Sequence, residues 1–200
     1  MQLFMSGMSP FVRKARVAIR ELGLADQITE APINTTALAS DPAIVAANPI
    51  GKIPTLVRDD GPAIYDSRII TRYLNDYADG SLYPENRIWE ILTLEATADA
   101  IMEAAVAMAY EVRLRPETER SPAWIEAQWQ KAERGISAVN NKWMSHLNGP
   151  LNIGQIAVAC ALSYADLRHG DRDWRAQNKP LADWHANFAQ RDSMIATAPE

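Results

Sequence analysis

Ser9 stands directly before Pro10 and Phe11, in a position typical of the start of a helix. At such a start, the free backbone N–H groups and the helix dipole favour an anion, and the serine hydroxyl adds a donor. A sulfur anion is one species that this arrangement stabilises. Plain helix capping explains the same residues when they are considered alone.

Two further segments offer complementary binding groups. In the stretch from Asn48 to Leu56, Pro54 lies just before a strand, which predicts a cis Ile53–Pro54 peptide bond. The N–H and C=O of Ile53 would then be available to an extended peptide ligand, although an ordinary loop is the simpler interpretation. Asp66 and Ser67 precede another expected helix, where they offer an acceptor for an ammonium and donors for a carboxylate, or act only as a cap.

Short elements separated by turn signals must position these groups. We expect the order β-α-β-α-β-β-α in the first part of the chain, a small α/β layer structure. The expected strands are residues 2–5, 28–32, 55–57 and 63–65, and the expected helices are residues 10–22, 42–47 and 67–77. The last two strands flank Asp59, Asp60 and Gly61, a hairpin signal.

The rest of the chain has helical periodicity and no convincing strand. Long helices are predicted from Asn86 to Leu114 and from Ser121 to before Gly149, and a last helix begins near Pro180. The segment from Leu151 to Leu167 is apolar on nearly all sides, so it should form a central, buried helix. We therefore predict an α/β domain at residues 1–78, a linker at 79–87 and an all-helical domain at 88–200.

Composition excludes several classes of function. The 200 residues carry a formal net charge of -5 and show no large basic cluster, which makes nucleic acid an unlikely ligand. No apolar run reaches the length of a membrane span, and the first ten residues do not lead us to expect export. The three histidines lack metal-ligand spacing, nucleotide-binding glycine loops are absent, and a single cysteine, Cys160, is typical of a cytoplasmic protein.

Together these segments resemble a glutathione transferase over nearly the whole chain. The resemblance rests on Ser9 to Lys14, Asn48 to Leu56, Tyr65 to Arg68 and the helix from Leu151 to Arg168. It is strongest with small bacterial members, and Ser9-Pro10-Phe11 resembles the corresponding motif of the plant tau class. The resemblance implies a thioredoxin-like domain that binds glutathione, followed by a helical domain that shapes the pocket for an electrophile.

The same resemblance implies a role for individual residues. Ser9 would donate to the glutathione sulfur, and the glutathione-binding residues would be Phe11, Lys52, Ile53, Pro54, Asp66 and Ser67. Candidates for the electrophile pocket are Met8, Met102, Met108 and Tyr110, although core packing explains them equally well. The expected activity is conjugation of glutathione, as co-substrate, to small hydrophobic electrophiles in detoxification. We expect a cytoplasmic homodimer with no bound cofactor and no metal.

The sequence departs from the family pattern in one stretch that concerns binding. No Lys, Arg or His occurs between Glu21 and Gly51, where many relatives carry a cation for the glycyl carboxylate of glutathione. Two alternatives therefore stay open: a catalytically weak binding or regulatory protein with the same fold, or another glutathione-dependent enzyme such as a peroxidase, dehalogenase or isomerase.

Overall fold

A computed structural model describes residues 1–199, and its contacts divide them into two compact units. The first unit comprises residues 1–84 together with residues 191–199, and the second comprises residues 85–190. The first contains all the strands of the described chain, and the second is helical.

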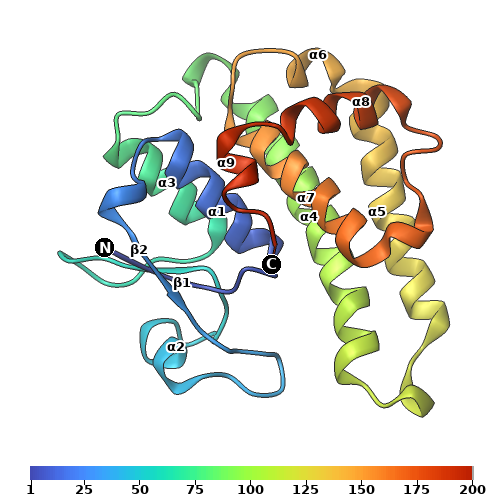
Figure 1. The fold of residues 1–200 in the computed structure, drawn as a ribbon, viewed down its shortest axis with the longest axis horizontal. Coiled ribbons are helices and arrows are strands. Elements are labelled where there is room, and N and C mark those ends of the chain that lie inside the picture. Colours follow the sequence, from blue (N-terminus) through green and yellow to red (C-terminus); the bar gives the residue numbers. More distant parts are fainter. Residues whose placement is uncertain (200) are drawn as a thin grey trace. The chain divides into compact units, whose positions relative to one another are not determined.

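The first unit is built on a three-stranded mixed sheet with the order β2-β1-β3 (Figure 1). Strand β1 runs parallel to β2 and antiparallel to β3, with Phe4 opposite Thr55. Helices α1 and α3 lie side by side against the sheet. The elements are β1 (Gln2–Met5), α1 (Pro10–Glu21), β2 (Thr29–Pro32), α2 (Pro42–Ala47), β3 (Thr55–Val57) and α3 (Ser67–Tyr77).

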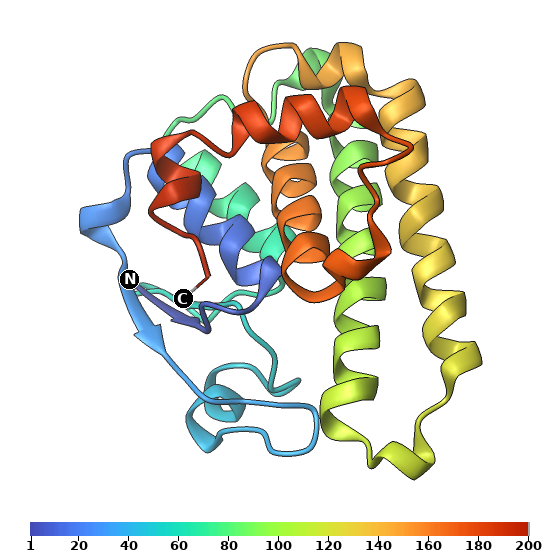
Figure 2. The same ribbon diagram turned by 45° about the vertical axis from the view of Figure 1, so that its right-hand side comes forward.

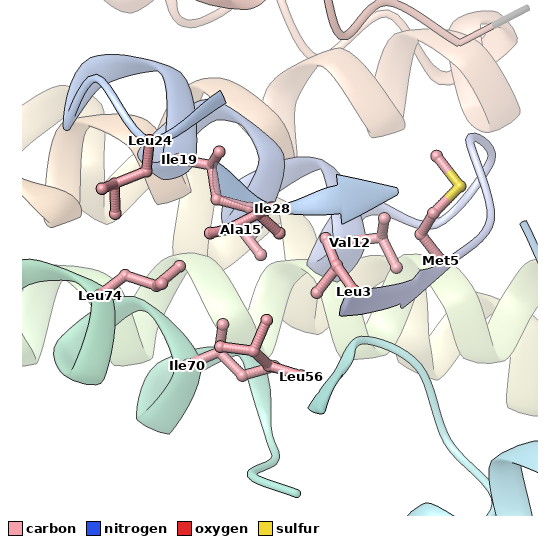
Figure 3. Close-up of a cluster of buried hydrophobic side chains, with 10 residues drawn as sticks. All are labelled: Leu3, Met5, Val12, Ala15, Ile19, Leu24, Ile28, Leu56, Ile70 and Leu74. Atoms are coloured by element: carbon pink, nitrogen blue, oxygen red, sulfur yellow. The ribbon is translucent and has the colours of Figure 1, made fainter. Parts of the chain in front are cut away.

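Aliphatic side chains from the sheet and from both helices form the core of this unit (Figure 3). Leu3 and Leu56 project from the sheet toward Val12 and Ala15 of α1 and Ile70 of α3, and all five are inaccessible to solvent. Burial of this apolar surface fixes α1 and α3 on the sheet, and with them the two helix starts that the sequence marks as candidate sites.

The expected hairpin is shorter than predicted. Residues 63–65 do not form a strand: Ile64 makes one isolated antiparallel bridge with Leu56, through two backbone hydrogen bonds of 2.9 and 3.0 Å. The proline ring of Pro62 removes a backbone donor at the start of this segment, and the Pro62 carbonyl is occupied by Arg58 Nε at 3.0 Å. The ladder therefore stops after one pair.

The second unit is built around α4 (Ile88–Leu114), which lies between α5 (Pro122–Lys142) and α7 (Ile153–His169) (Figure 2). Helices α6 (Met144–Leu147) and α8 (Lys179–Phe188) complete it, and short 3₁₀ turns occur at Glu85–Arg87, Glu117–Glu119 and Gly170–Arg172. As predicted, α7 is buried along most of its length, and Asn152 and Gln155 form a reciprocal capping box at its start.

Residues 191–199 group with the first unit, whereas the sequence analysis placed them in the helical domain. They include helix α9 (Asp192–Ile195), which packs against α1. Arg191 donates twice to the Glu21 carboxylate, at 2.8 Å each, and Ser193 also donates to it. Since these partners are about 170 positions apart in the chain, local sequence patterns carry no sign of the contact.

Candidate functional site

Ser9 caps α1 at the end of the loop that follows β1. Its Oγ accepts a hydrogen bond from the Val12 N–H at 3.4 Å, and its backbone N–H donates to Ser6 O at 3.1 Å. Pro10 occupies the first helical turn, where its missing N–H costs no hydrogen bond, and no acidic residue lies in that turn. The half-buried Ser9 hydroxyl therefore keeps its hydrogen available at the positive end of a twelve-residue helix.

A buried asparagine organises the loop that carries Lys52, Ile53 and Pro54. Asn48 Nδ2 donates to Lys52 O and to Thr55 Oγ1, both at 3.0 Å, and its Oδ1 accepts from the Ile50 N–H at 3.0 Å. The Thr55 hydroxyl donates to Lys52 O at 2.9 Å. Sequence analysis did not assign this role to Asn48 or Thr55, because the hydrogen bonds become visible only once the loop is folded; an asparagine before a proline was the available signal.

The predicted cis peptide bond between Ile53 and Pro54 is confirmed. Among residues 1–199, neither the N–H nor the C=O of Ile53 forms a backbone hydrogen bond, and β3 begins only at Thr55. The Lys52 side chain is exposed and makes no ion pair with any described residue. Ile53 thus presents a free donor and a free acceptor beside the end of the sheet, which is the requirement for pairing with an extended peptide.

Asp66 and Ser67 form the start of α3. Asp66 is the N-cap: its Oδ1 accepts from the Arg68 N–H at 3.0 Å, and its Oδ2 accepts from Arg68 Nη2 at 3.2 Å. Burial alone would raise the pKa of the Asp66 carboxyl, but the hydrogen bonds from Arg68 and the positive charges of Arg68 and Lys14 outweigh it, so the pKa is lowered. Asp66 is therefore ionised at neutral pH and can accept from an ammonium.

Strand direction brings these three features to one edge of the sheet. Ser9 follows the carboxyl end of β1, and Ile53 precedes the amino end of β3, which is antiparallel to β1. The bridge between Leu56 and Ile64 makes the chain after Ile64 run in the same direction as β1 again, so Asp66 and Ser67 extend toward that edge. This edge of the sheet therefore presents the Ser9 hydroxyl, the unpaired N–H and C=O of Ile53, and the ionised Asp66 carboxylate.

The residues predicted for the electrophile pocket do not gather in one place, unlike the three groups at the sheet edge. Met8 and Phe11 flank Ser9 and are half-buried. Met102 and Met108 are buried in α4, whereas Tyr110 is half-exposed. Since Met108 and Tyr110 are two residues apart on one helix, they point in directions about 200° apart and cannot line the same pocket.

A groove of about 640 Å³ lies between α4 and α5 of the second unit. Its wall consists of α4 residues, most of them small but including Ile101 and Glu103, together with Gln128, Lys131 and Gly135 of α5. None of the predicted electrophile residues lies in its wall. The groove is therefore separate from the candidate acceptor residues.

Ser163 and His185 form a hydrogen-bonded pair in the second unit, with Oγ and Nε2 2.9 Å apart. Arg175 Nη2 lies 3.1 Å from His185 Nδ1 and is held in turn by Asp166. A guanidinium has only donors, so Nδ1 accepts and the ring proton is on Nε2, which donates to Ser163. In this state His185 cannot take a proton from Ser163, and the pair does not form a nucleophile with its base.

The described residues contain neither a candidate metal site nor a candidate membrane-spanning helix. Within residues 1–199, no group of three or more His, Cys, Asp or Glu side chains is placed to hold a metal ion. In the same part of the chain, no helix has the length and apolar character needed to cross a membrane.

A small mixed sheet with a serine-capped first helix, followed by an all-helical unit, defines the fold of a glutathione transferase. The family model for the N-terminal domain of glutathione S-transferases matches residues 8–76, and that for the C-terminal domain matches residues 122–187. The chain belongs to the glutathione S-transferase family. The predicted fold class is thereby confirmed.

Several relatives match this protein over its whole length. The uncharacterised GST-like protein YibF of Escherichia coli is 30% identical over 206 residues, which cover 100% of this chain and 98% of the relative. A glutathione transferase family member from Pseudomonas fluorescens Pf-5, solved with bound glutathione, is 38% identical with a TM-score of 0.97 and coverage of 100% and 98%. Another structure from that species, solved with S-(propanoic acid)-glutathione, is 36% identical with a TM-score of 0.92 and covers 100% of both chains.

Proposed function

We propose that this protein is a glutathione transferase that joins the thiolate of glutathione to small hydrophobic electrophiles, with Ser9 stabilising the thiolate. The observation that carries the proposal is the Ser9 hydroxyl, whose oxygen accepts from Val12 while its hydrogen stays available at the start of α1. The tau-like sequence Ser9-Pro10-Phe11 supports the same role.

The interaction energies available at Ser9 are large enough to bring the pKa of the glutathione thiol down to neutrality. A free thiol has a pKa of about 8.5 and is only a few per cent thiolate at neutral pH, although the thiolate is the nucleophile. A hydrogen bond to a charged sulfur contributes about 1.5–3 kcal/mol, and a helix start contributes about 0.3–1 kcal/mol. At about 1.4 kcal/mol for each pKa unit, their sum lowers the thiol pKa by roughly 1.5–3 units, which reaches neutrality.

The other groups at the sheet edge fit the rest of the tripeptide. The free N–H and C=O of Ile53 would pair with the backbone of the cysteinyl residue, with Pro54 fixing the turn. Asp66 would accept from the γ-glutamyl ammonium, and the start of α3 with Ser67 would donate to the γ-glutamyl carboxylate. Lys52 would approach the glycyl carboxylate, and Phe11 and Met8 would border the sulfur.

Conjugation is favoured over the alternatives by one comparison. In S-(propanoic acid)-glutathione, the compound bound by the 36% identical relative, the sulfur carries a substituent. A site that accommodates such a compound has room for the product of conjugation. We extend that property to this chain, and we further propose that it acts as a cytoplasmic homodimer with glutathione as its co-substrate and no cofactor.

Ser9→Ala tests the proposal, with Ser6→Ala in the same loop as the matched control. The Ser9→Ala variant should bind glutathione within a few fold of the parent, and its bound thiol should ionise at a pH higher by about 1–2 units, read from thiolate absorbance. Turnover of 1-chloro-2,4-dinitrobenzene at neutral pH should fall about tenfold or more and partly recover as the pH rises. A parent that binds glutathione but produces no conjugate would support the binding-protein alternative.

Capping must be separated from catalysis in this test, because loss of the cap alone costs about 1 kcal/mol of stability. The free energy of unfolding of both variants is therefore measured alongside the thiol pKa. If Ser9→Ala is destabilised while the pKa and turnover stay at parental values, Ser9 is only a cap. Ser9→Cys should form a mixed disulfide with oxidised glutathione, because a helix start lowers the pKa of a cysteine.

A further inference from the structure

Two neighbouring loops of the first unit lie where the glycyl end of glutathione is expected. Residues 33–41 follow β2, and residues 48–52 lead into Ile53. Because β2 is parallel to β1, residues 33–41 leave the sheet at the same edge as Ser9. The strand order β2-β1-β3, with the Ile64 bridge beyond β3, puts them on the opposite side of Ser9 from Asp66. A glutathione with its γ-glutamyl end on Asp66 and its sulfur on Ser9 therefore extends its glycine toward these loops.

The two loops are held against each other by hydrogen bonds and by a close contact. Thr35 Oγ1 donates to Gly51 O at 3.2 Å and accepts from the Asp41 N–H at 3.4 Å. Ser40 lies against Gly51, since a Cβ added to this glycine would be only 2.7 Å from Ser40 Oγ. Together the loops form one wall, which we call the glycyl corner.

The glycyl corner carries no net charge. Its charged side chains are Asp41 and Lys52, one of each sign. Lys52 is exposed, and Asp41 is partly exposed, with its Oδ1 accepting from the Ala43 N–H at 2.8 Å as the cap of α2. A carboxylate placed here would lose part of its hydration and would meet one screened cation and one screened anion.

The other cations described in residues 1–84 and 191–199 are buried or bound to other partners. Lys14 is 0% exposed. Each arginine of this unit has a partner outside the corner: Arg13 binds Met194 O, Arg16 and Arg20 bind Glu30, Arg58 binds Pro62 O, Arg68 binds Asp66, Arg72 pairs with Asp76, and Arg191 binds Glu21. Within this described unit, Lys52 is the one cation left for a glycyl carboxylate.

We propose that the site takes γ-glutamylcysteinyl thiols whose glycyl carboxyl is amidated as readily as it takes glutathione, because the glycyl corner is neutral. The inference rests on the proposed function and deepens it by naming the class of thiol. Recognition is concentrated on the γ-glutamyl and cysteinyl residues, which meet Asp66, the start of α3 and the backbone of Ile53. A carboxamide keeps the shape of the glycyl end and removes the charge that the corner does not compensate.

The ratio of the Kd of glutathione amide to that of glutathione is the quantity that decides this inference. A site that holds the glycyl carboxylate through charge-assisted hydrogen bonds favours the acid about tenfold or more. A neutral corner with screened charges keeps the ratio within about fivefold of one.

Calorimetry on the parent protein measures both values. N-Acetylglutathione, in which the γ-glutamyl ammonium is blocked, is the matched control ligand and should bind at least tenfold more weakly than glutathione, because Asp66 loses its charged partner. The proposal is overturned if glutathione amide binds more than fivefold more weakly than glutathione. It is also overturned if N-acetylglutathione binds like glutathione, since the ligand would then not lie with its γ-glutamyl end on Asp66.

Charge variants of the glycyl corner test the cause. Asp41→Asn keeps a cap for α2 and removes the negative charge, so it should tighten glutathione binding about two- to fivefold and leave the amide within twofold. Lys52→Ala should weaken glutathione binding to a similar extent and leave the amide unchanged. Asp26→Asn, an exposed change in the same unit, is the control and should alter neither Kd.

Both ligands are measured on the same variant, so a loss of folded protein cancels in the ratio of the two Kd values. If Asp41→Asn and Lys52→Ala both keep the parental ratio, the glycyl end does not lie in the corner and the proposal is refuted.

Turnover of 1-chloro-2,4-dinitrobenzene with each thiol separates this inference from the proposed function. If both thiols bind equally and neither yields a conjugate, the proposed function fails and the thiol class of the site stands. If glutathione is conjugated while its amide neither binds nor reacts, the function stands and the inference is refuted. If the parent binds neither thiol, both are refuted.

Discussion

In the first unit, the groups that we propose for glutathione are mostly backbone atoms and caps at the ends of short elements. In the second unit, the candidate acceptor groups are side chains of one helix, α4, of which Tyr110 is half-exposed. Backbone groups at a helix start or strand end offer the same donors whatever the surrounding side chains are, so they suit one fixed co-substrate. Side chains on packed helices can be exchanged without altering the fold, so they suit a variable second substrate.

Asn48→Ala should have the largest effect in the first unit. The variant loses the three side-chain hydrogen bonds that hold the Lys52–Thr55 loop, and Asn48 is only 1% exposed. We expect the free energy of unfolding to fall by about 2–3 kcal/mol and glutathione to bind more weakly, measured by urea denaturation and calorimetry. Asn34→Ala, at an exposed position, should change stability by less than about 0.5 kcal/mol. Parental glutathione affinity in Asn48→Ala would show that the loop does not position the ligand.

Gly154→Val tests the second unit, where close helix packing takes the place of loop hydrogen bonds. A Cβ at this position would lie 3.0 Å from Leu94 Cδ2 and 3.2 Å from Leu94 Cβ. We expect overpacking between α4 and α7 to cost about 1–3 kcal/mol, measured by thermal and urea unfolding. The affinity of the folded protein for glutathione should stay within twofold of the parent. A large loss of that affinity would contradict the separation of the two units' roles.

Glu21→Gln tests the contact that ties residues 191–199 to the first unit. The hydrogen bond from Arg191 lowers the pKa of the Glu21 carboxyl; burial opposes this, and Ser193 and the charge of Arg191 add to the lowering. The carboxylate therefore stabilises the fold above its unfolded pKa of about 4.3, and this contribution is lost as the pH falls through the depressed folded value.

At neutral pH the Glu21→Gln variant should be less stable by about 1 kcal/mol, a modest figure because Arg191 is 40% exposed. Measured by urea denaturation from pH 7 down to pH 3, the difference between parent and variant should shrink in acid. Glu133→Gln, an exposed change on α5, should show no such trend. If the stability difference between parent and Glu21→Gln is the same at all pH values, the charge of Glu21 is not its cause.

Lys52→Ala should have the smallest effect. Lys52 is exposed, so its attraction to the glycyl carboxylate is screened, and we expect a loss of at most about 1 kcal/mol in glutathione binding, or about fivefold in Kd by calorimetry. Lys131→Ala in the second unit is the control. If Lys52→Ala binds glutathione like the parent, the glycyl carboxylate is held by another group or remains in water.

Much of the candidate glutathione site could be predicted from the sequence because its signals are local. Ser9 before Pro10, Pro54 before a strand and Asp66 before a helix are each features of a few neighbouring residues, and the structure finds a cap, a cis peptide bond and a second cap there. The same reasoning overestimated the hairpin, because Pro62 limits it to one bridge with Leu56. It also assigned Met108 and Tyr110 to one pocket, although residues two positions apart on a helix point in directions about 200° apart.

The sequence by itself determined the order of elements, the fold family and the residues that begin each helix, because caps, prolines and hydrophobic periodicity act over a few positions. Only the tertiary structure decided which distant groups meet. Asn48 holds the ligand loop through Thr55, and Arg191 returns to Glu21. The physical reason is that such contacts form when burial of apolar surface packs the elements together, and side-chain direction and pairing are fixed only in the packed state.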